Sequence, residues 1–526
     1  MIPYKRYEQI KDFLFLLICV SIIFDNVPKF LRFNFLGGPL GNQLGVYPIF
    51  FGLIFTCFCY YSGNIDLKNK KFLKYIILCF AVLTLSTING ILIYPYYDQI
   101  LHAPVVQFER FPNVYSALVN HNIPISQKEL VGLWIIVRSI KNDIFTILYT
   151  LGFSYMIFIW YYGEFEKCCK ILRNGIRISL IIFICYGFID VAFQLGSGVA
   201  QNILECINPI LHPIAVDHDW WPPLLWKGQV RSVLSEPSRV GNYISFVLPF
   251  LFIPVLNKTR YWKGYLSFIF FTTYLVFMTK ARTAVAMLFI IFFLTAVMLP
   301  VLKKKVLIKR FVYIILVAGI AFVSSIFSIA SINPAGNNDR DSINEKVHEY
   351  LADNVGSLAS QNQRSNIARY ALIKSNIKTG MEHPILGVGR LLNGTYTVAN
   401  FDEFDMTSGE VKKWVTDFYS QGPIKNNFDA MNAYVTAFST TGILGLICLI
   451  LPFYYGIFTL FKKILVCQMD DERVRLSCLV IALIASLVAG CNGSLTLIYA
   501  VWILLPIVYL AAFEDKVKKE NVNEPA

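Results

Sequence analysis

The sequence predicts an all-α polytopic membrane protein with about 12 spanning helices and a large, partly helical segment on the outer side of the membrane. Composition is the first reason, because 56% of the 526 residues are apolar and only 15% are charged. That balance is too apolar for a soluble globular protein. The second reason is the recurrence of long apolar runs. The third is a single long polar stretch, residues 331–431, between two groups of these runs.

The apolar runs are long enough to cross a membrane as helices. A spanning helix needs about 20 mostly apolar residues, because the hydrocarbon layer is about 30 Å thick and a helix rises about 1.5 Å per residue. A membrane β-barrel is excluded, since the runs are about twice as long as a membrane strand and do not alternate in polarity. In chain order the predicted spans are residues 12–27, 46–62, 72–94, 142–162, 175–195, 239–256, 263–280, 283–302, 311–330, 433–461, 474–490 and 494–513.

These spans divide the chain into four parts. The first part carries nine spans and two outer loops, the second is the polar stretch, the third carries the last three spans and the fourth is a short tail. The parts are residues 1–330 with loops 95–141 and 196–238, then 331–431, 432–513 and 514–526.

Basic residues predict the orientation. If the N-terminus is cytoplasmic, the compact inner connections and the tail carry 26 of the 47 basic residues. Short loops rich in Lys and Arg stay in the cytoplasm. Both termini are therefore expected in the cytoplasm, with residues 331–431 on the outer side of the membrane. The net charge of +13 then faces anionic membrane lipid, and no nucleic-acid partner is expected.

Cysteine usage indicates neither a metal site nor a cofactor. Ten of the 12 cysteines lie in predicted spans or on the inner side. Only Cys206 and Cys491 face the outer side, and the sequence leaves open whether they pair. No CxxC motif or His/Cys cluster is present, so no metal and no cofactor are expected.

Arginines near span ends on the outer side are the candidate functional residues. Arg282 lies with Lys280 in a tight outer turn. A cation at a membrane edge is costly unless it has an anionic partner, although an arginine at a helix end can also extend its side chain toward water. A guanidinium binds two phosphate oxygens at once and never loses its charge. Arg231, Arg239, Arg282 and Arg364 all lie on outer segments close to span ends.

Four short motifs in order along residues 230–450 carry a family resemblance. The chain resembles the O-antigen polymerase and O-antigen ligase superfamily of bacterial inner-membrane glycosyltransferases. Their order, together with the topology, is more specific than any one motif. They are Leu234-Ser235-Glu236-Pro237-Ser238-Arg239-Val240-Gly241, Thr279-Lys280-Ala281-Arg282-Thr283, Arg364 heading a helix that leads to His383-Pro384-Ile385-Leu386-Gly387-Val388-Gly389, and Asn432-Ala433-Tyr434 followed by Thr441-Gly442-Ile443-Leu444-Gly445-Leu446.

The resemblance implies a GT-C-like polysaccharide polymerase. Such an enzyme transfers a growing glycan from undecaprenyl diphosphate to a sugar hydroxyl on a second lipid-linked repeat unit. Its expected partners are the lipid-linked oligosaccharide donor and acceptor, and a chain-length regulator is a further partner to consider. The residues expected to be catalytic are Arg364, Arg282 and Glu236, and those expected to bind the diphosphate or glycan are Arg231, Arg239, Lys280, Asn432 and Tyr434.

Arg364 and Arg369 cannot both face the site if residues 361–379 are helical. Five residues rotate a helix by about 140°, so the two side chains leave different faces. Arg364 is expected to face the substrate because it matches the family position. Arg369 is expected to pair with a carboxylate on the solvated face.

The general base has several candidates. Relatives of the ligase type tend to carry a histidine directly before the asparagine aligned at Asn432, whereas this chain has Met431. Glu236, Asp429 and His383 therefore remain as acceptors for the proton of the attacking hydroxyl. Glu236 could equally be a structural ion-pair partner, and His383 a loop-packing residue. Asp190, within a predicted span, could pair helices or line the site.

Two alternatives to polymerisation remain open. A ligase or a protein O-oligosaccharyltransferase of the same superfamily would share the scaffold and differ in its acceptor. A lipid-linked oligosaccharide transporter has a similar number of spans. Transporters usually show internal repeats and site residues near the midplane of the membrane. The chain shows no such repeat, and its charged residues gather on the outer side.

Overall fold

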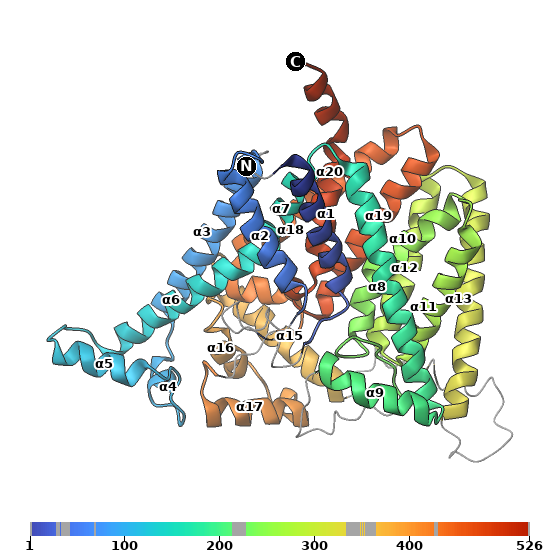
Figure 1. Ribbon diagram of the computed structural model, residues 1–526. Coiled ribbons are helices and arrows are strands. Elements are labelled where there is room, and N and C mark those ends of the chain that lie inside the picture. Colours follow the sequence, from blue (N-terminus) through green and yellow to red (C-terminus); the bar gives the residue numbers. More distant parts are fainter. Residues whose placement is uncertain are drawn as a thin grey trace.

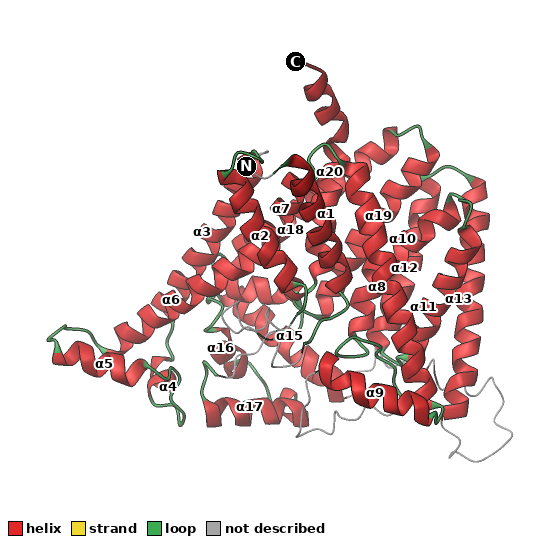
Figure 2. Ribbon diagram, viewed as in Figure 1, coloured by secondary structure: helices red, strands yellow, loops and turns green. Residues whose placement is uncertain are grey.

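The computed structural model describes residues 3–27, 32, 43–67, 70–212, 228–332, 348, 350, 352, 364–425 and 430–523. Every regular element within these ranges is a helix, and they contain no strand (Figure 2). The all-α fold predicted from the sequence is confirmed.

Each predicted span overlaps a long helix. Among the described residues, eight helices are long and apolar enough to cross a membrane, and two more are shorter and apolar, as expected for a multi-pass membrane protein. The long helices are α1 (Tyr4–Ser21), α2 (Val46–Tyr61), α3 (Lys70–Ile93), α6 (Gln127–Ile147) continued by η4 (Leu148–Gly152) and α7 (Phe153–Trp160), α8 (Phe165–Gln194), α10 (Arg239–Leu256), α11 (Trp262–Met278), α12 (Arg282–Val301), α13 (Lys305–Ile332), α18 (Ala433–Val466), α19 (Asp470–Ala489) and α20 (Tyr499–Asn523).

The shorter helices gather at one end of the bundle (Figure 1). The two termini lie at the opposite end. The connections at the end of the bundle away from the termini therefore contain short helices. These shorter helices are α4 (Tyr97–Leu101), α5 (Phe111–Asn120), α9 (Gly198–Leu211), α15 (Arg364–Glu382), α16 (Asn393–Ala399) and α17 (Gly409–Gln421).

Helix α10 lies at the centre of the bundle and packs against α19 and α12. Most of its residues are buried. Helices α12 and α13 instead expose large apolar side chains such as Phe293, at 66%, and Leu316, at 56%. Exposed apolar side chains at this density fit a surface that contacts lipid rather than water. The bundle therefore has an enclosed centre and a lipid-facing exterior.

A break in α18 holds the His383–Gly389 loop against the bundle. Gly442 has φ +63°, and a Cβ there would lie 2.3 Å from the carbonyl carbon of Ile385. The loop uses the backbone groups that the break releases, because Ile443 N donates to the Pro384 carbonyl at 2.8 Å and Gly389 N donates to the Thr440 carbonyl at 2.9 Å. Only glycine combines this backbone conformation with so close an approach. The residue after the loop, Arg390, therefore has a fixed starting position.

Candidate functional site

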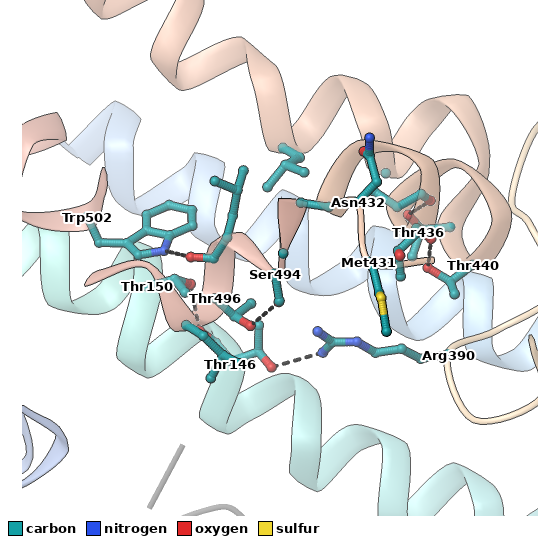
Figure 3. A pocket seen from close by; sticks show the side chains of 18 of the residues that line it. Thr146, Thr150, Arg390, Met431, Asn432, Thr436, Thr440, Ser494, Thr496 and Trp502 are labelled. Atoms are coloured by element: carbon teal, nitrogen blue, oxygen red, sulfur yellow. Dashed lines mark hydrogen bonds between the residues drawn. The ribbon is translucent and has the colours of Figure 1, made fainter. Parts of the chain in front are cut away.

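A cavity of about 460 Å³ opens between α3, α6, α10, α15, α18 and α20 (Figure 3). Its polar lining comes from connections at the end of the bundle opposite the termini and from residues of α6, η4 and α15, the first turn of α10 and the first half of α18. Apolar residues further along α3 and α18, such as Leu83 and Leu449, complete it. The polar lining residues are Thr146, Thr150, Glu236, Ser238, Arg239, Asn242, Arg369, Arg390, Asn432, Thr436, Thr440, Thr441, Asn492, Ser494 and Thr496.

Three arginines from three separate segments line this cavity. Arg239 is the first residue of α10, Arg369 lies in α15, and Arg390 directly follows the His383–Gly389 loop. Glu236 is the one carboxylate that lines the cavity among the described residues. An excess of fixed guanidinium groups next to an apolar region is suited to a multiply charged anion attached to a lipid.

Arg390 is oriented by α6. Its Nη1 donates to Thr146 Oγ1 at 2.9 Å (Figure 3). The same Nη1 lies 3.7 Å from Asp143 Oδ1. Asp143 is 2% exposed, so its charge is held in the protein interior. Just beyond it, α6 continues into the π-helical turn η4, a type of distortion that is frequent at functional sites. The hydroxyl of Thr146 and the buried carboxylate of Asp143 together hold the guanidinium at the cavity.

The expectation for Arg369 was wrong. We expected it to pair with a carboxylate on a solvated face, but it lines the cavity, and its Nη1 donates to Asn492 Oδ1 at 3.2 Å. The physical reason is that α15 lies against the bundle. Ala368 and Ala371 are completely buried, and a Cβ at Gly380 would overlap Phe438 of α18.

Arg282 and the start of α15 are brought together. Arg282 opens α12, and its Nη1 lies 3.4 Å from the Oδ1 of Asn366 in the first turn of α15. Burial lowers the pKa of Arg282, and the positive charge of Arg369 lowers it further. Arg364 is the first residue of α15, and its side chain lies outside the described part of the structure. The role proposed for Arg364 therefore stays a prediction.

Glu236 lies in a turn that the rest of the protein holds in place. It lines the cavity and accepts a hydrogen bond from Ser238 Oγ at 3.2 Å. The preceding residue, Ser235, donates from its backbone N and from Oγ to the two carboxylate oxygens of Asp25, at 2.7 and 2.8 Å. Asp25 also faces the Nε of Arg239 at 4.0 Å. The turn that carries Glu236 is thus held by Asp25, and Ser238 orients the carboxylate of Glu236.

Arg231 is not brought to the cavity. It is 4% exposed, and its Nη1 donates to the Ser235 carbonyl at 3.0 Å. Burial lowers the pKa of Arg231, while the charge of Asp190 opposes that change. Asp190 Oδ2 accepts from the backbone N of Ser232 at 2.8 Å. Arg231 and Asp190 therefore hold the turn that carries Glu236 rather than contacting a substrate in the cavity.

The other expected binding residues divide into one that lines the cavity and two that do not. Asn432 lines it, and its Oδ1 caps α18 by accepting from the backbone N of Tyr434 and Val435 at 3.1 and 3.2 Å. Tyr434 donates from Oη to the Leu487 carbonyl at 2.6 Å, which joins α18 to α19. Lys280 lies in its turn with φ +49° and its amine close to Gly228.

Of the alternative bases, His383 is described by the structure and does not line the cavity. The His383 ring packs edge-on against Tyr396, with the ring centroids 5.4 Å apart. Asp429 lies outside the described residues. Met431, which stands where ligase relatives tend to have histidine, lines the cavity with φ +52°.

Cys206 and Cys491 are both exposed and free.

Arg390 is the main residue that the sequence reasoning missed. Its signal was available, because it is the first residue after Gly387-Val388-Gly389, the end of a motif already singled out. Asn242, Thr436, Asn492 and Thr496 carried no comparable signal, since isolated amide and hydroxyl residues near span ends are common.

Comparison with known families finds a match over part of the chain. Residues 265–450 match the family model described as O-Antigen ligase. The matched segment runs from α11 into the first half of α18 and includes Arg282, Arg369 and Arg390. A comparison with curated proteins finds no match. The family match confirms the resemblance to the O-antigen ligase and polymerase superfamily and indicates a glycosyltransferase-like membrane enzyme of lipopolysaccharide biosynthesis.

Proposed function

We propose that this chain, with its O-antigen ligase-type segment at residues 265–450, is a polysaccharide polymerase. It would join oligosaccharide repeat units carried on undecaprenyl diphosphate at the periplasmic face of a bacterial inner membrane. Its donor would be the growing lipid-linked glycan and its acceptor a single lipid-linked repeat unit.

The observation that carries this proposal is the convergence of Arg239, Arg369 and Arg390 on one partly apolar cavity. When a glycan leaves a diphosphate, negative charge develops on the phosphate oxygens. Guanidinium groups already in place stabilise that charge without reorganisation, and removing one such donor typically lowers the rate by about 10²–10³-fold. Arg282, beside α15, adds positive charge at the same end of the bundle.

The reaction needs one further group, a base. A hydroxyl oxygen of the acceptor attacks the anomeric carbon of the donor glycan and forms the new glycosidic bond. The bond between that carbon and the diphosphate oxygen breaks, and undecaprenyl diphosphate leaves with the electron pair. Glu236 lines the same cavity as Arg239, which supports it as the base that accepts the hydroxyl proton.

The apolar part of the cavity supports a lipid-linked substrate. Val82 and Leu83 of α3, Ile147 and Leu151 of the α6–η4 segment, and Leu449 of α18 line it. A polyprenyl chain can pack against these side chains without leaving an apolar environment. A soluble sugar nucleotide would leave this surface unused.

Met431 favours a polymerase over a ligase. It lines the cavity at the position where ligase relatives tend to carry a histidine, and a thioether cannot accept a proton from an attacking hydroxyl. Chemistry that depends on an imidazole at this position is therefore not open to this chain.

The glycan profile of a deletion strain tests the proposal. Loss of a polymerase should leave single repeat units attached to lipid A-core, and the full chain supplied on a plasmid should restore long chains. Complete absence of attached glycan would instead indicate a ligase. Accumulation of lipid-linked units on the cytoplasmic face would indicate a transporter.

A further inference from the structure

A second cavity, of about 190 Å³, adjoins the first. The two share Glu236, Arg239, Asn242 and Leu497 in their linings. The second cavity is enclosed by the end of α1, the turn before α10 and the start of α20. Its own polar residues are Asp25, Asn26, Gln43, Ser235, Tyr243 and Tyr499.

Two polar groups of the second cavity have unused hydrogen-bonding capacity. Gln43 is 7% exposed and donates from Nε2 to the Leu497 carbonyl at 3.0 Å. Its Oε1 has no hydrogen-bond partner within the described ranges, and the same is true of the side-chain amide of Asn242, which is half-buried. Buried polar groups without partners are uncommon in proteins. A ligand that supplies hydroxyl groups would satisfy them.

The size and lining of this cavity differ from those of the first. Sites for drug-sized ligands are typically about 300–1,000 Å³, so about 190 Å³ suits a smaller group. Carboxylate and amide oxygens accept hydrogen bonds from hydroxyl groups, and amide nitrogens donate to them. Tyr243 and Tyr499, each 4% exposed, add aromatic edge for contact with the C–H groups of a ring. A single sugar ring combines these requirements.

We propose that the second cavity binds the terminal sugar of the acceptor repeat unit. This inference rests on the proposed polymerase function and assigns the two substrates to different places. The first cavity takes the donor's diphosphate and the start of its lipid. The second takes the sugar that carries the attacking hydroxyl.

Glu236 is placed between the two substrates by this assignment. It lines both cavities, so its carboxylate can reach a hydroxyl held in the second while the leaving diphosphate is held in the first. Asn242 also lines both cavities and can orient the acceptor ring. The shared lining therefore marks the place where the new glycosidic bond forms.

Binding of two probes to the purified full chain in detergent tests this assignment. The first probe is undecaprenyl diphosphate without sugar. The second is the free repeat-unit oligosaccharide, released by mild acid from lipid-linked units of the host strain. Each dissociation constant is measured separately for the parent and for three variants.

Two variants alter the second cavity alone. Ala500→Leu fills it, because Ala500 is 5% exposed and lines only this cavity, and Gln43→Met removes the unpaired amide oxygen with little change in volume. Each should weaken oligosaccharide binding at least tenfold and change undecaprenyl diphosphate binding less than twofold. Ala512→Leu, on the same helix but lining neither cavity, is the matched control and should change neither constant.

The outcomes separate this inference from the proposed function. A parent protein that fails to bind undecaprenyl diphosphate would overturn the polymerase proposal. Normal diphosphate binding with no oligosaccharide binding, or with oligosaccharide affinity within twofold of the parent in both cavity variants, would overturn the acceptor site alone. Equal loss of both probes in both variants would overturn the assignment of two separate sites.

Discussion

The Nη1 atom of Arg369 lies 3.2 Å from the Oδ1 atom of Asn492. The arginine is thus oriented by a neutral amide, and no carboxylate pairs with it within the described ranges. An amide fixes the direction of a guanidinium without neutralising it, so its full charge remains for an anion in the cavity. This distinguishes Arg369 from Arg390, which faces the buried carboxylate of Asp143 at 3.7 Å.

Arg369→Ala should abolish long glycan chains while the protein still inserts. Arg369→Lys keeps the charge but loses the planar pair of donors, so it should retain only a small part of the activity. Glycan length on gels and protein level in membranes are the measurements. Lys378→Ala, an exposed position on the same helix, is the control and should behave like the parent. Normal chains from Arg369→Ala would remove this residue from the mechanism.

Arg390→Ala should lower kcat by about 10²–10³-fold if it stabilises the leaving diphosphate. Asp143→Asn should have a smaller effect, because Thr146 still accepts a hydrogen bond from Arg390 at 2.9 Å. Steady-state kinetics with lipid-linked repeat units separates the two roles. Asp143 acts through Arg390, so in the Arg390→Ala background the second substitution should add nothing. Additive losses would show that Asp143 has an independent role.

Glu236→Gln should remove turnover and leave binding of undecaprenyl diphosphate within about twofold. The amide keeps the shape of the side chain and can still contact Ser238, but it cannot accept a proton from a hydroxyl. The measurements are single-turnover rate and affinity on the same purified sample. Appreciable turnover by the glutamine variant would exclude Glu236 as the base.

Gly442→Ala should destabilise the fold and displace the loop that precedes Arg390. The left-handed backbone costs a non-glycine residue roughly 1–2 kcal/mol, and the new Cβ would also overlap Ile385. A lower thermal midpoint together with reduced activity is the expected result. Gly319→Ala, in α13 with nothing within 4 Å of its Cβ, is the matched control and should be neutral or slightly stabilising. An unchanged midpoint for Gly442→Ala would contradict the described contact.

His212 should make the fold sensitive to acid. Burial lowers its pKa well below the usual 6.5, with the charge of Arg231 adding to the effect. The unfolded chain therefore binds a proton that the folded chain does not, so stability is full above pH 6.5 and falls as pH drops below it, by up to about 1.4 kcal/mol per unit. Thermal midpoints at pH 7.5 and 5.5 should differ less in His212→Phe than in the parent. Equal differences would exclude this residue as the source.

The sequence by itself determined the membrane class, the all-α fold and the approximate place of every long helix. These follow from local properties, because an apolar run of about 20 residues without alternation in polarity crosses lipid as a helix, whose backbone groups pair within the segment. The four motifs of the family resemblance can also be recognised from the order of residues 230–450 alone.

Only the tertiary structure decided which arginines face the cavity. The face that a helix presents depends on what packs against it, and α15 lies on α18 instead of in water, which brings Arg369 to the cavity. Arg231 has the same charge and a similar position near a span end, yet it is buried beside Asp190 because the turn before α10 closes over it. Arg390 reaches the cavity through backbone contacts between two segments more than 50 residues apart in the sequence. Long-range packing of this kind leaves no periodic or compositional trace in a single sequence.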